Sequence, residues 1–309
     1  MENTSCPLCS AVEFDTLIHT PIMMKDDEQD AEMQFVICLN CDFIYFNPRV
    51  PVQKIKNYYP TYYLSYQGAK AWGKYARLVE FGLKRELKKR LKMVLKSTAK
   101  PHGRLLDLGC GRPEFLRQFQ QSTHWEVTGI DFDSSAWQEE RFAHLNLHEG
   151  DIAEMDLRAF GKFDVITLWH YLEHDYNPAH TLRRLKDVAN AETHLIIEVP
   201  NYDSLTRKWQ SKHWQGFHTP RHTGVYTPET LAKMLHNHGW KVKKQYTYGS
   251  LDPFVLWWLG EREKKKLNWN KSMESEFPKF LLQKLISSPL FSLERFISLG
   301  VQTTVAVPD

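Results

Sequence analysis

The sequence predicts an α/β protein with a doubly wound, mostly parallel sheet of seven strands and a small N-terminal metal-binding ribbon. From residue 103 onward, short apolar runs alternate with helical stretches, which is the order typical of a parallel sheet. Two Cys-x-x-Cys pairs lie within the first 41 residues. The 309 residues are 42% hydrophobic and 25% charged, as in ordinary soluble globular proteins.

Residues 1–50 are expected to form a zinc ribbon. Its ligands would be the four cysteines of the two pairs, Cys6, Cys9, Cys38 and Cys41. Four thiolates suit a tetrahedral Zn²⁺ and leave no open coordination position, so this zinc would be structural. The alternative is redox chemistry, but a thioredoxin-type site needs only one such pair, placed near a βαβ unit.

Residues 51–101 are expected to form a connector and a basic amphipathic helix. The connector contains the tyrosine-rich stretch "NYYPTYYLSY" (57–66), and the helical pattern covers about 70–97. One side of the helix is apolar, and the other carries Lys84, Arg85, Lys88, Lys89, Arg90, Lys92 and Lys96. A solvated face over a packed stripe is the default interpretation, and contact with an anionic membrane surface or with nucleic acid stays open.

Residues 102–309 are expected to carry the sheet. The candidate strands are 104–109, 126–131, 145–151, 163–169, 193–200, 241–249 and 301–307. Asn177-Pro178 and Thr227-Pro228 look like helix starts, each an N-cap followed by proline. An aromatic and charged insertion at 250–300 separates the last two strands, and a lid or core packing is expected there, with an interface or a membrane-surface element as alternatives.

The chain shows neither a signal peptide nor a run of roughly 18 apolar residues. We therefore expect a soluble, cytoplasmic protein with reduced cysteines. The formal net charge of +3 is too small to argue for nucleic acid by itself.

The stretch "LLDLGCGRPEFL" (105–116) combines a strand, a glycine turn and a helix start. Gly109 and Gly111 allow a tight turn and a close approach to a ligand beyond the strand's carboxyl end. A dinucleotide fingerprint needs a third small residue, and Glu114 stands there instead. Asp107 also disfavours a pyrophosphate, whereas it suits a cofactor that carries an ammonium group and a sulfonium.

This stretch resembles motif I of class I S-adenosylmethionine-dependent methyltransferases, and the resemblance covers nearly the whole chain. It implies a Rossmann-like sheet and a cofactor site made of Asp107, Gly109, Gly111, Asp131, Asp151, Ile152 and Trp169. Asp131 would hold the ribose, Asp151 the adenine amine and Ile152 the adenine ring. The segment "FDVITLWHYLEHDYNP" (163–178) is similar to the quinone-biosynthesis-like branch of the family. The segments "IIEVPNYDSL" and "GFHTPRHTGVYTPETL" are similar to bacterial relatives, many of which carry an N-terminal zinc ribbon. Pro113 replaces the family's third glycine, which puts the donor loop in question.

The pentapeptide His170-Tyr-Leu-Glu173-His174 has the H-x-x-E-H spacing of an inverted zinc peptidase. Because it follows a predicted strand, the peptidase interpretation is disfavoured, and the methyltransferase family carries a similar "LEH" sequence there. His170, His174 and His222 are the candidates for the base that deprotonates an acceptor. A divalent cation at His170, Glu173 and His174 is a further hypothesis, beside purely structural hydrogen bonds.

Trp214, His218 and Arg221 are the candidate residues for binding the methyl acceptor. The predicted function is methyl transfer to a small molecule, by O-methylation of a quinone-like, glycan or lipid-linked compound. The alternatives are an RNA methyltransferase, a sugar C-methyltransferase and a non-catalytic interaction protein. Acceptor identity and oligomeric state stay open.

Overall fold

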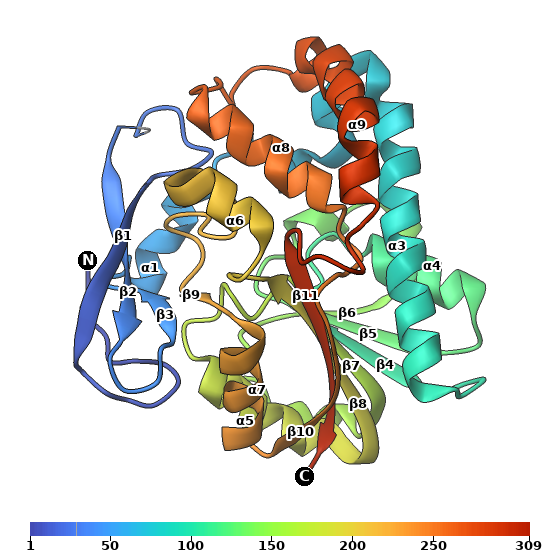
Figure 1. Ribbon diagram of the computed structural model, residues 1–309. Helices are drawn as coiled ribbons and strands as arrows, with labels where there is room; N and C mark the ends of the chain where they lie inside the picture. Colours follow the sequence, from blue (N-terminus) through green and yellow to red (C-terminus); the bar gives the residue numbers. More distant parts are fainter. Residues whose placement is uncertain (29) are drawn as a thin grey trace.

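The computed structural model describes residues 1–28 and 30–309, and its centre is a twisted seven-stranded sheet (Figure 1). Its strands are β4 (Arg104–Leu108), β5 (Glu126–Asp131), β6 (Asn146–Glu149), β7 (Phe163–Trp169), β8 (Ala189–Pro200), β10 (Trp240–Tyr246) and β11 (Val301–Pro308). Their order is β10-β11-β8-β7-β4-β5-β6, and β11 pairs antiparallel with both of its neighbours. The predicted fold class is confirmed.

Helices cover both faces of this sheet because successive residues of its strands point to opposite sides. On β4, Leu105 packs with α3 (Ala76–Thr98) and α4 (Glu114–Ser122), whereas Leu106 packs with α5 (Pro178–Leu185) and α7 (Pro228–Asn237). The predicted starts of α5 and α7 are confirmed, since the side chains of Asn177 and Thr227 each accept a hydrogen bond from a backbone N–H of the first turn.

The N-terminal ribbon is joined to the large domain and is not a separate body. Its strands β1 (Phe14–Pro21), β2 (Glu32–Cys38) and β3 (Ile44–Phe46) form a sheet whose fourth strand is β9 (Gly224–Val225). Ribbon residues such as Phe43 and Tyr45 belong to the same buried cluster as Leu106 of β4. The ribbon therefore packs against the sheet on the side of α5 and α7 (Figure 1).

The connector consists of short helices that precede α3. They are α1 (Val52–Ile55), the 3-10 turn Lys56–Tyr58, α2 (Leu64–Gln67) and the 3-10 segment Gly68–Tyr75. The sequence predicts a helix from about residue 70, but α3 begins only at Ala76, because Gly73 adopts φ +52° and ψ −127° and breaks the helix. The apolar stripe of α3 packs on the sheet through Val94, as expected.

The 250–300 insertion forms the upper layer of Figure 1 with α6 (Leu205–Gln210). It comprises α8 (Pro253–Lys264), the 3-10 turn Met273–Glu276 and α9 (Phe277–Phe291). It packs on the connector, with the rings of Trp72 and Trp258 centred 5.7 Å apart and those of Tyr75 and Phe277 stacked at 4.2 Å. No helix in the described ranges has the length and apolar character needed to cross a bilayer.

Candidate functional site

The glycine loop after β4 has the backbone that the sequence predicts. Gly109 has φ +71°, its N–H donates to the carbonyl oxygen of Ile130 (2.8 Å), and a β-carbon there would lie 2.3 Å from Cδ2 of Tyr171. Gly111 has φ +46°, and a β-carbon there would point into open space with no atom within 4 Å. Pro113 takes the N-cap position of α4, so the loop accommodates the proline without losing the helix.

Two buried carboxylates flank this loop. Asp107 is 3% exposed and accepts a hydrogen bond from the hydroxyl of Thr167 (2.6 Å). Asp131 accepts from the N–H groups of Gly111 (2.7 Å) and Asp133 (3.2 Å). Burial is the largest cause that raises both pKa values, that of Asp107 to about 7. The site is therefore electrostatically suited to a cationic ligand.

Three further residues predicted to bind the cofactor lie around the same strand ends. The loop with Asp151 and Ile152 reaches Asp131 through a hydrogen bond from the N–H of Gly150 to the Asp131 carbonyl oxygen (2.9 Å). Asp151 is exposed and Ile152 is buried. The indole of Trp169 is buried between the sheet and the α3/α4 layer, edge-on to Phe115 at 5.7 Å.

His170 follows β7 directly and has φ +54°, an uncommon conformation for a side chain of this size. Its Nδ1 lies 3.3 Å from Oε1 of Glu173, and its Nε2 lies 3.1 Å from Oε1 of Glu198. Burial alone lowers its pKa, but the hydrogen bonds and charges of the two glutamates outweigh burial and raise the pKa to about 9. His170 thus holds a proton on each ring nitrogen at neutral pH, which argues against its role as a base.

Glu198 is a site residue that sequence reasoning missed. Its carboxylate also accepts from the N–H (2.6 Å) and the hydroxyl (2.7 Å) of Ser250, at the start of the insertion. The guanidinium of Arg90 donates to the same hydroxyl (3.1 Å) and lies over the ring of Trp169. The sequence contains one indication of this role, because Glu198 is an acidic residue inside the otherwise apolar strand segment "LIIEVP".

Three other histidines, His174, His218 and His222, form a cluster near His170. The rings of His174 and His222 are 4.4 Å apart, and those of His218 and His222 are 5.2 Å apart. Burial lowers the pKa of His174 and, to a larger extent, those of His218 and His222. These three imidazoles are consequently neutral at physiological pH.

Several polar atoms of this cluster are available to bind a ligand or a proton. Nδ1 of His222 donates to the carbonyl oxygen of Gly216 (2.8 Å), and Nδ1 of His174 lies 3.2 Å from the carbonyl oxygen of Arg221. Within residues 1–28 and 30–309, the Nε2 atoms of His174 and His222 and Oε2 of Glu173 have no hydrogen-bond partner. Ligand atoms of Glu173, His174 and His222 lie within 4.8 Å of one another, so His222, and not the predicted His170, completes a possible cation-binding group with Glu173 and His174.

Two residues expected to touch the acceptor have structural contacts instead. Arg221 is fully buried and donates to the carbonyl oxygens of Met23 (2.8 Å), Met24 (3.5 Å) and Tyr58 (2.6 Å). Its guanidinium is used to join the ribbon to the connector, and this leaves little capacity for an acceptor anion. Trp214 is fully buried in the cluster between ribbon and domain.

Tyrosines of the connector are the second group that the sequence analysis missed. The hydroxyl of Tyr59 lies 3.2 Å from Nδ1 of His174, and the hydroxyl of Tyr63 lies 2.7 Å from Nε2 of His218. The ring of Tyr66 stands 5.3 Å from that of Tyr63, and burial, followed by the charges of Asp133, Tyr63 and Asp131, raises the pKa of Tyr66 to about 12. The connector therefore extends from the carboxylate of Asp131, at the end of β5, to the histidine cluster. The only indication of this role in the sequence is the high density of tyrosines in 57–66.

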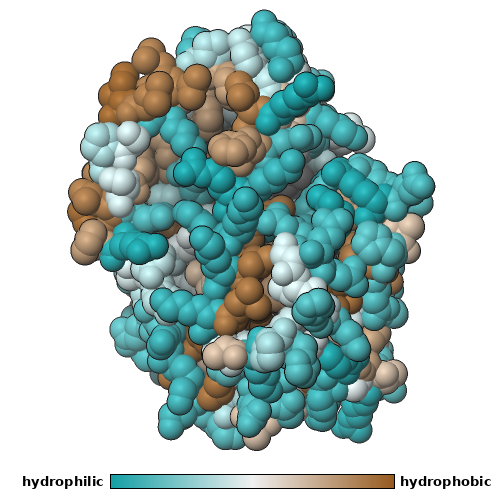
Figure 2. Space-filling model, turned by 90° about the vertical axis from the view of Figure 1, so that its right-hand side faces the viewer, coloured by the Kyte–Doolittle hydropathy of each residue, from teal (hydrophilic) through white to brown (hydrophobic). Residues whose placement is uncertain are grey.

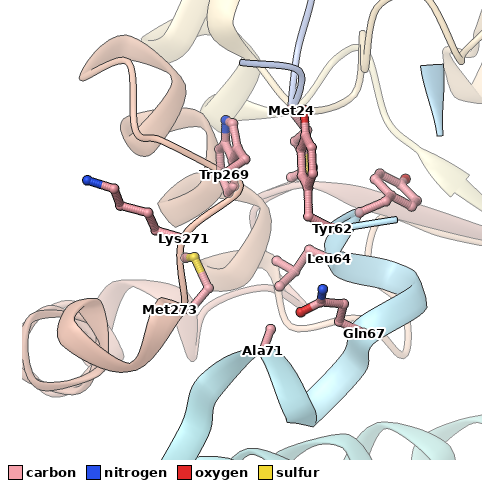
Figure 3. Close-up of a pocket in the computed structure, with 9 residues that line it drawn as sticks. Met24, Tyr62, Leu64, Gln67, Ala71, Trp269, Lys271 and Met273 are labelled. Carbon is pink, nitrogen blue, oxygen red and sulfur yellow. The ribbon is translucent and has the colours of Figure 1, made fainter. Parts of the chain in front are cut away.

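Figure 3 shows a small pocket that the connector lines together with the ribbon and the segment after α8. Met24 lines it from the ribbon, Tyr63 and Gln67 line it from the connector, and Trp269 and Met273 line it from the segment after α8. Tyr63 also contacts His218, so its side chain connects the lining of the pocket to the histidine cluster.

The four cysteines of the ribbon converge, and none of the described cysteines forms a disulfide. The sulfur atoms of Cys6 and Cys41 are 3.5 Å apart, as are those of Cys9 and Cys38. Tetrahedral zinc–thiolate bonds of about 2.3 Å place sulfur atoms roughly 3.8 Å apart. The cluster is able to hold a metal ion of this kind.

Comparisons with known proteins agree with this geometry. A family model described as a methyltransferase domain matches residues 76–245. The structure is similar to magnesium protoporphyrin IX methyltransferase from Synechocystis PCC 6803 with bound SAH, at a TM-score of 0.51 and 13% identity over 83% of this chain and 99% of that one.

Two further solved structures are similar at lower scores. One is a chain from the complex between the Haloferax volcanii Trm112 methyltransferase activator and a putative methyltransferase (TM-score 0.49, 16% identity, 78% of this chain and 97% of that one). The other is a SAM-dependent methyltransferase from Archaeoglobus fulgidus (TM-score 0.46, 21% identity, 72% and 94%). No curated protein matches the sequence. Because the family model covers more than half of the chain and the sheet has the fold of the SAH-bound methyltransferase, the chain belongs to the methyltransferase domain family.

Proposed function

We propose that this enzyme transfers a methyl group from S-adenosylmethionine to an oxygen atom of a small molecule of the quinone-like, glycan or lipid-linked kind. The observation that carries the proposal is the joining of two half-sites by one tyrosine-rich connector. One half-site is the glycine loop with its buried carboxylates, and the other is the cluster of neutral histidines. Such a pairing would bring a cationic donor and a proton acceptor to the same strand ends.

The residues around Gly111 fit the donor. The β-carbon position of Gly111 is open, and the N–H of Gly111 donates to the carboxylate of Asp131, which suits the two ribose hydroxyls. Asp107 would face the cationic amino-acid end of the donor, and a cation there would lower its raised pKa. Asp151 and Ile152 would contact adenine, and the buried ring of Trp169 would pack under the carboxyl ends of the strands that form the site.

The reaction is an in-line displacement. A lone pair of the acceptor oxygen forms a bond to the methyl carbon, the carbon–sulfur bond breaks with its electron pair on sulfur, and the sulfonium becomes a thioether. The acceptor's proton needs a base, and Nε2 of His174 is our candidate, because His174 is neutral and its Nδ1 faces the carbonyl oxygen of Arg221. His222 is the second candidate, and His170 would hold Glu173 in place.

A divalent cation is a competing assignment for the same atoms. Oε2 of Glu173 is buried without a hydrogen-bond partner in the described chain, and the imidazoles of His174 and His222 are both neutral. These three groups would hold the ion, which would lower the pKa of a bound acceptor hydroxyl. In that case the histidines are ligands, and no separate base is required.

The experiment is a methyl-transfer assay with labelled S-adenosylmethionine and a panel of catechols, hydroquinones, glycans and polyprenyl-linked phenols. We expect a labelled ether and S-adenosylhomocysteine in equal amounts from at least one acceptor class. His174→Gln should reduce kcat by about 10²–10⁴-fold, whereas His144→Gln, at an exposed position, should leave it unchanged. If a chelator abolishes turnover while the zinc of the ribbon is retained, the result favours a divalent cation at Glu173, His174 and His222 over a histidine base. Two outcomes would contradict O-methylation of a small molecule. One is turnover with RNA as the only acceptor, and the other is transfer of the labelled methyl group to a carbon atom of the acceptor.

We further propose that Cys6, Cys9, Cys38 and Cys41 bind one structural Zn²⁺. The converged sulfur atoms support it. The ion would hold the ribbon whose carbonyl oxygens at Met23 and Met24 receive the guanidinium of Arg221. Zinc would thus act on the site only through the position of the connector.

A further inference from the structure

Helix α9 and the segment after it expose an unusual number of large apolar side chains. The members are Leu281, Leu282, Leu285, Ile286, Leu293, Phe296 and Ile297. Ile286 is 71% exposed and Phe296 is 84% exposed, so these side chains project into solvent. Scattered exposed apolar residues need no explanation, but a continuous group along one helix and its extension does.

Helix α3 also exposes large apolar side chains. Leu78 and Phe81, which are 59% and 65% exposed, lie at helical spacing near its start. We call them and the seven residues above the α3/α9 apolar patch. Further along α3, the exposed side chains are basic: Lys84, Arg85, Lys88, Lys89, Lys92 and Lys96. Glu80 is the one exposed acid of this helix among its described residues.

The two helices run side by side in the same direction. Near their starts, the rings of Tyr75 and Phe277 stack at 4.2 Å. About four turns further along α3, Nζ of Lys89 pairs with Oε1 of Glu294 (3.2 Å). Figure 2 shows the side of the molecule on which α3 lies, and hydrophobic residues gather at its upper left, with hydrophilic surface beside them.

Basic groups also lie at the other edge of α9. A groove between α8 and α9 is lined by Lys265, Lys279 and Leu282, among others. Lys279 is 68% exposed in its side chain and shares Glu276 with Arg262. Basic side chains therefore lie on both flanks of the apolar patch.

We propose that the α3/α9 apolar patch and the basic part of α3 form a surface that docks on an anionic phospholipid membrane. Aliphatic and phenylalanine side chains would enter the boundary between headgroups and acyl chains, while the lysines of α3 would face lipid phosphates. Charge complementarity favours this occupant over a second copy of the chain, because two copies would bring their basic faces together. RNA is disfavoured because phosphates offer nothing to the seven apolar side chains of α9 and its extension. The inference goes beyond the proposed function and does not depend on the identity of the acceptor.

The test is co-sedimentation of the full, zinc-loaded protein with vesicles of phosphatidylcholine with and without phosphatidylglycerol. We expect binding that requires the anionic lipid and weakens as salt is raised. Leu285→Glu combined with Ile286→Glu should lower the partition coefficient by about a hundredfold or more. Lys88→Gln combined with Lys92→Gln should lower it by about thirtyfold.

Matched controls separate docking from general effects of charge and hydrophobicity. Lys241→Gln with Lys243→Gln changes two exposed lysines on β10, and Val12→Glu with Val52→Glu changes two exposed apolar residues elsewhere. Both control pairs should bind vesicles like the wild type, and all variants should bind S-adenosylhomocysteine equally, which verifies folding. The proposal is overturned by absence of binding to anionic vesicles, or by binding that the patch variants and the controls affect alike. It is also overturned by a dimer that Leu285→Glu dissociates, or by RNA binding that only the lysine variants weaken.

Discussion

Nε2 of His170 lies 3.1 Å from Oε1 of Glu198, and the two side chains form a buried ion pair between the ends of β7 and β8. Burial alone would raise the pKa of Glu198, but the hydrogen bond and charge of His170 outweigh it and lower that pKa to about 2. Because Glu198 also binds Ser250, the pair fixes the start of the 250–300 insertion to the edge of the sheet where the site lies.

This pair should make stability depend on pH. The pKa of His170 is raised from 6.5 to about 9, so its contribution is complete below pH 6.5 and is lost as pH rises through 9. The pKa of Glu198 is lowered from 4.5 to about 2, so its contribution is complete above pH 4.5 and is lost as pH falls through 2. The difference in free energy of unfolding between wild type and His170→Gln should therefore be largest between these two limits and shrink toward pH 9. Denaturant titrations across pH measure it, with His144→Gln as the control, and a difference that grows toward pH 9 would contradict the pairing.

The two glycines of the loop should respond differently to alanine. Gly109→Ala meets both a positive φ and Tyr171 at 2.3 Å, so it should lower the free energy of unfolding by about 2–4 kcal/mol. Gly111→Ala meets only the positive φ, which costs about 1 kcal/mol, but it fills the proposed cofactor space. We expect Gly111→Ala to remain folded and to lose affinity for S-adenosylhomocysteine. Equal destabilisation by the two substitutions would show that Tyr171 does not restrict Gly109.

Removal of a ribbon cysteine should abolish metal binding and loosen the connector. Metal analysis should find about one zinc per wild-type chain and almost none in Cys9→Ser. The melting temperature of Cys9→Ser should also fall, because the ribbon carbonyl oxygens that hold Arg221 lose their support. Cys110→Ala is the control, since Cys110 is buried beside the sheet and outside the cluster, and it should retain its zinc. Zinc-free wild-type protein with an unchanged melting temperature would disprove a structural zinc.

The neutral histidines predict the pH profile of methyl transfer. Because burial lowers the pKa of His174 below 6.5, the proposed base is already unprotonated at neutral pH. The ratio kcat/KM should therefore be flat above about pH 7 and decline only below about pH 6.5. If His170 were the base, with its pKa of about 9, the rate would instead rise from pH 7 to 9, and this outcome would overturn our assignment.

The fold and the strand-end positions of the proposed donor residues were accessible from the sequence because they depend on local patterns. Apolar runs located the seven strands, and Gly109, Gly111 and Asp131 stand at fixed positions relative to strand ends. The acceptor half depends on contacts between distant segments. Nothing near Arg221 in the sequence indicates that it would donate to carbonyl oxygens of the ribbon.

Histidine roles were equally hidden from the sequence. His170 and His174 have similar neighbours along the chain, yet the hydrogen bonds and charges of Glu173 and of Glu198, which lies 28 residues away, outweigh burial and raise the pKa of His170 to about 9. Burial keeps His174 neutral. Similarly, the tyrosines of 57–66 signalled an unusual segment, but only the fold places Tyr63 against His218.

Calorimetric titration of the zinc-loaded protein with S-adenosylhomocysteine tests the central claim most directly, with Asp131→Ala and the exposed ribbon variant Asp15→Ala for comparison. We predict a dissociation constant in the micromolar range, about 10- to 100-fold weaker binding by Asp131→Ala, and no change in Asp15→Ala. No binding to the folded wild-type protein, or equal affinity in Asp131→Ala, would contradict the donor site described above.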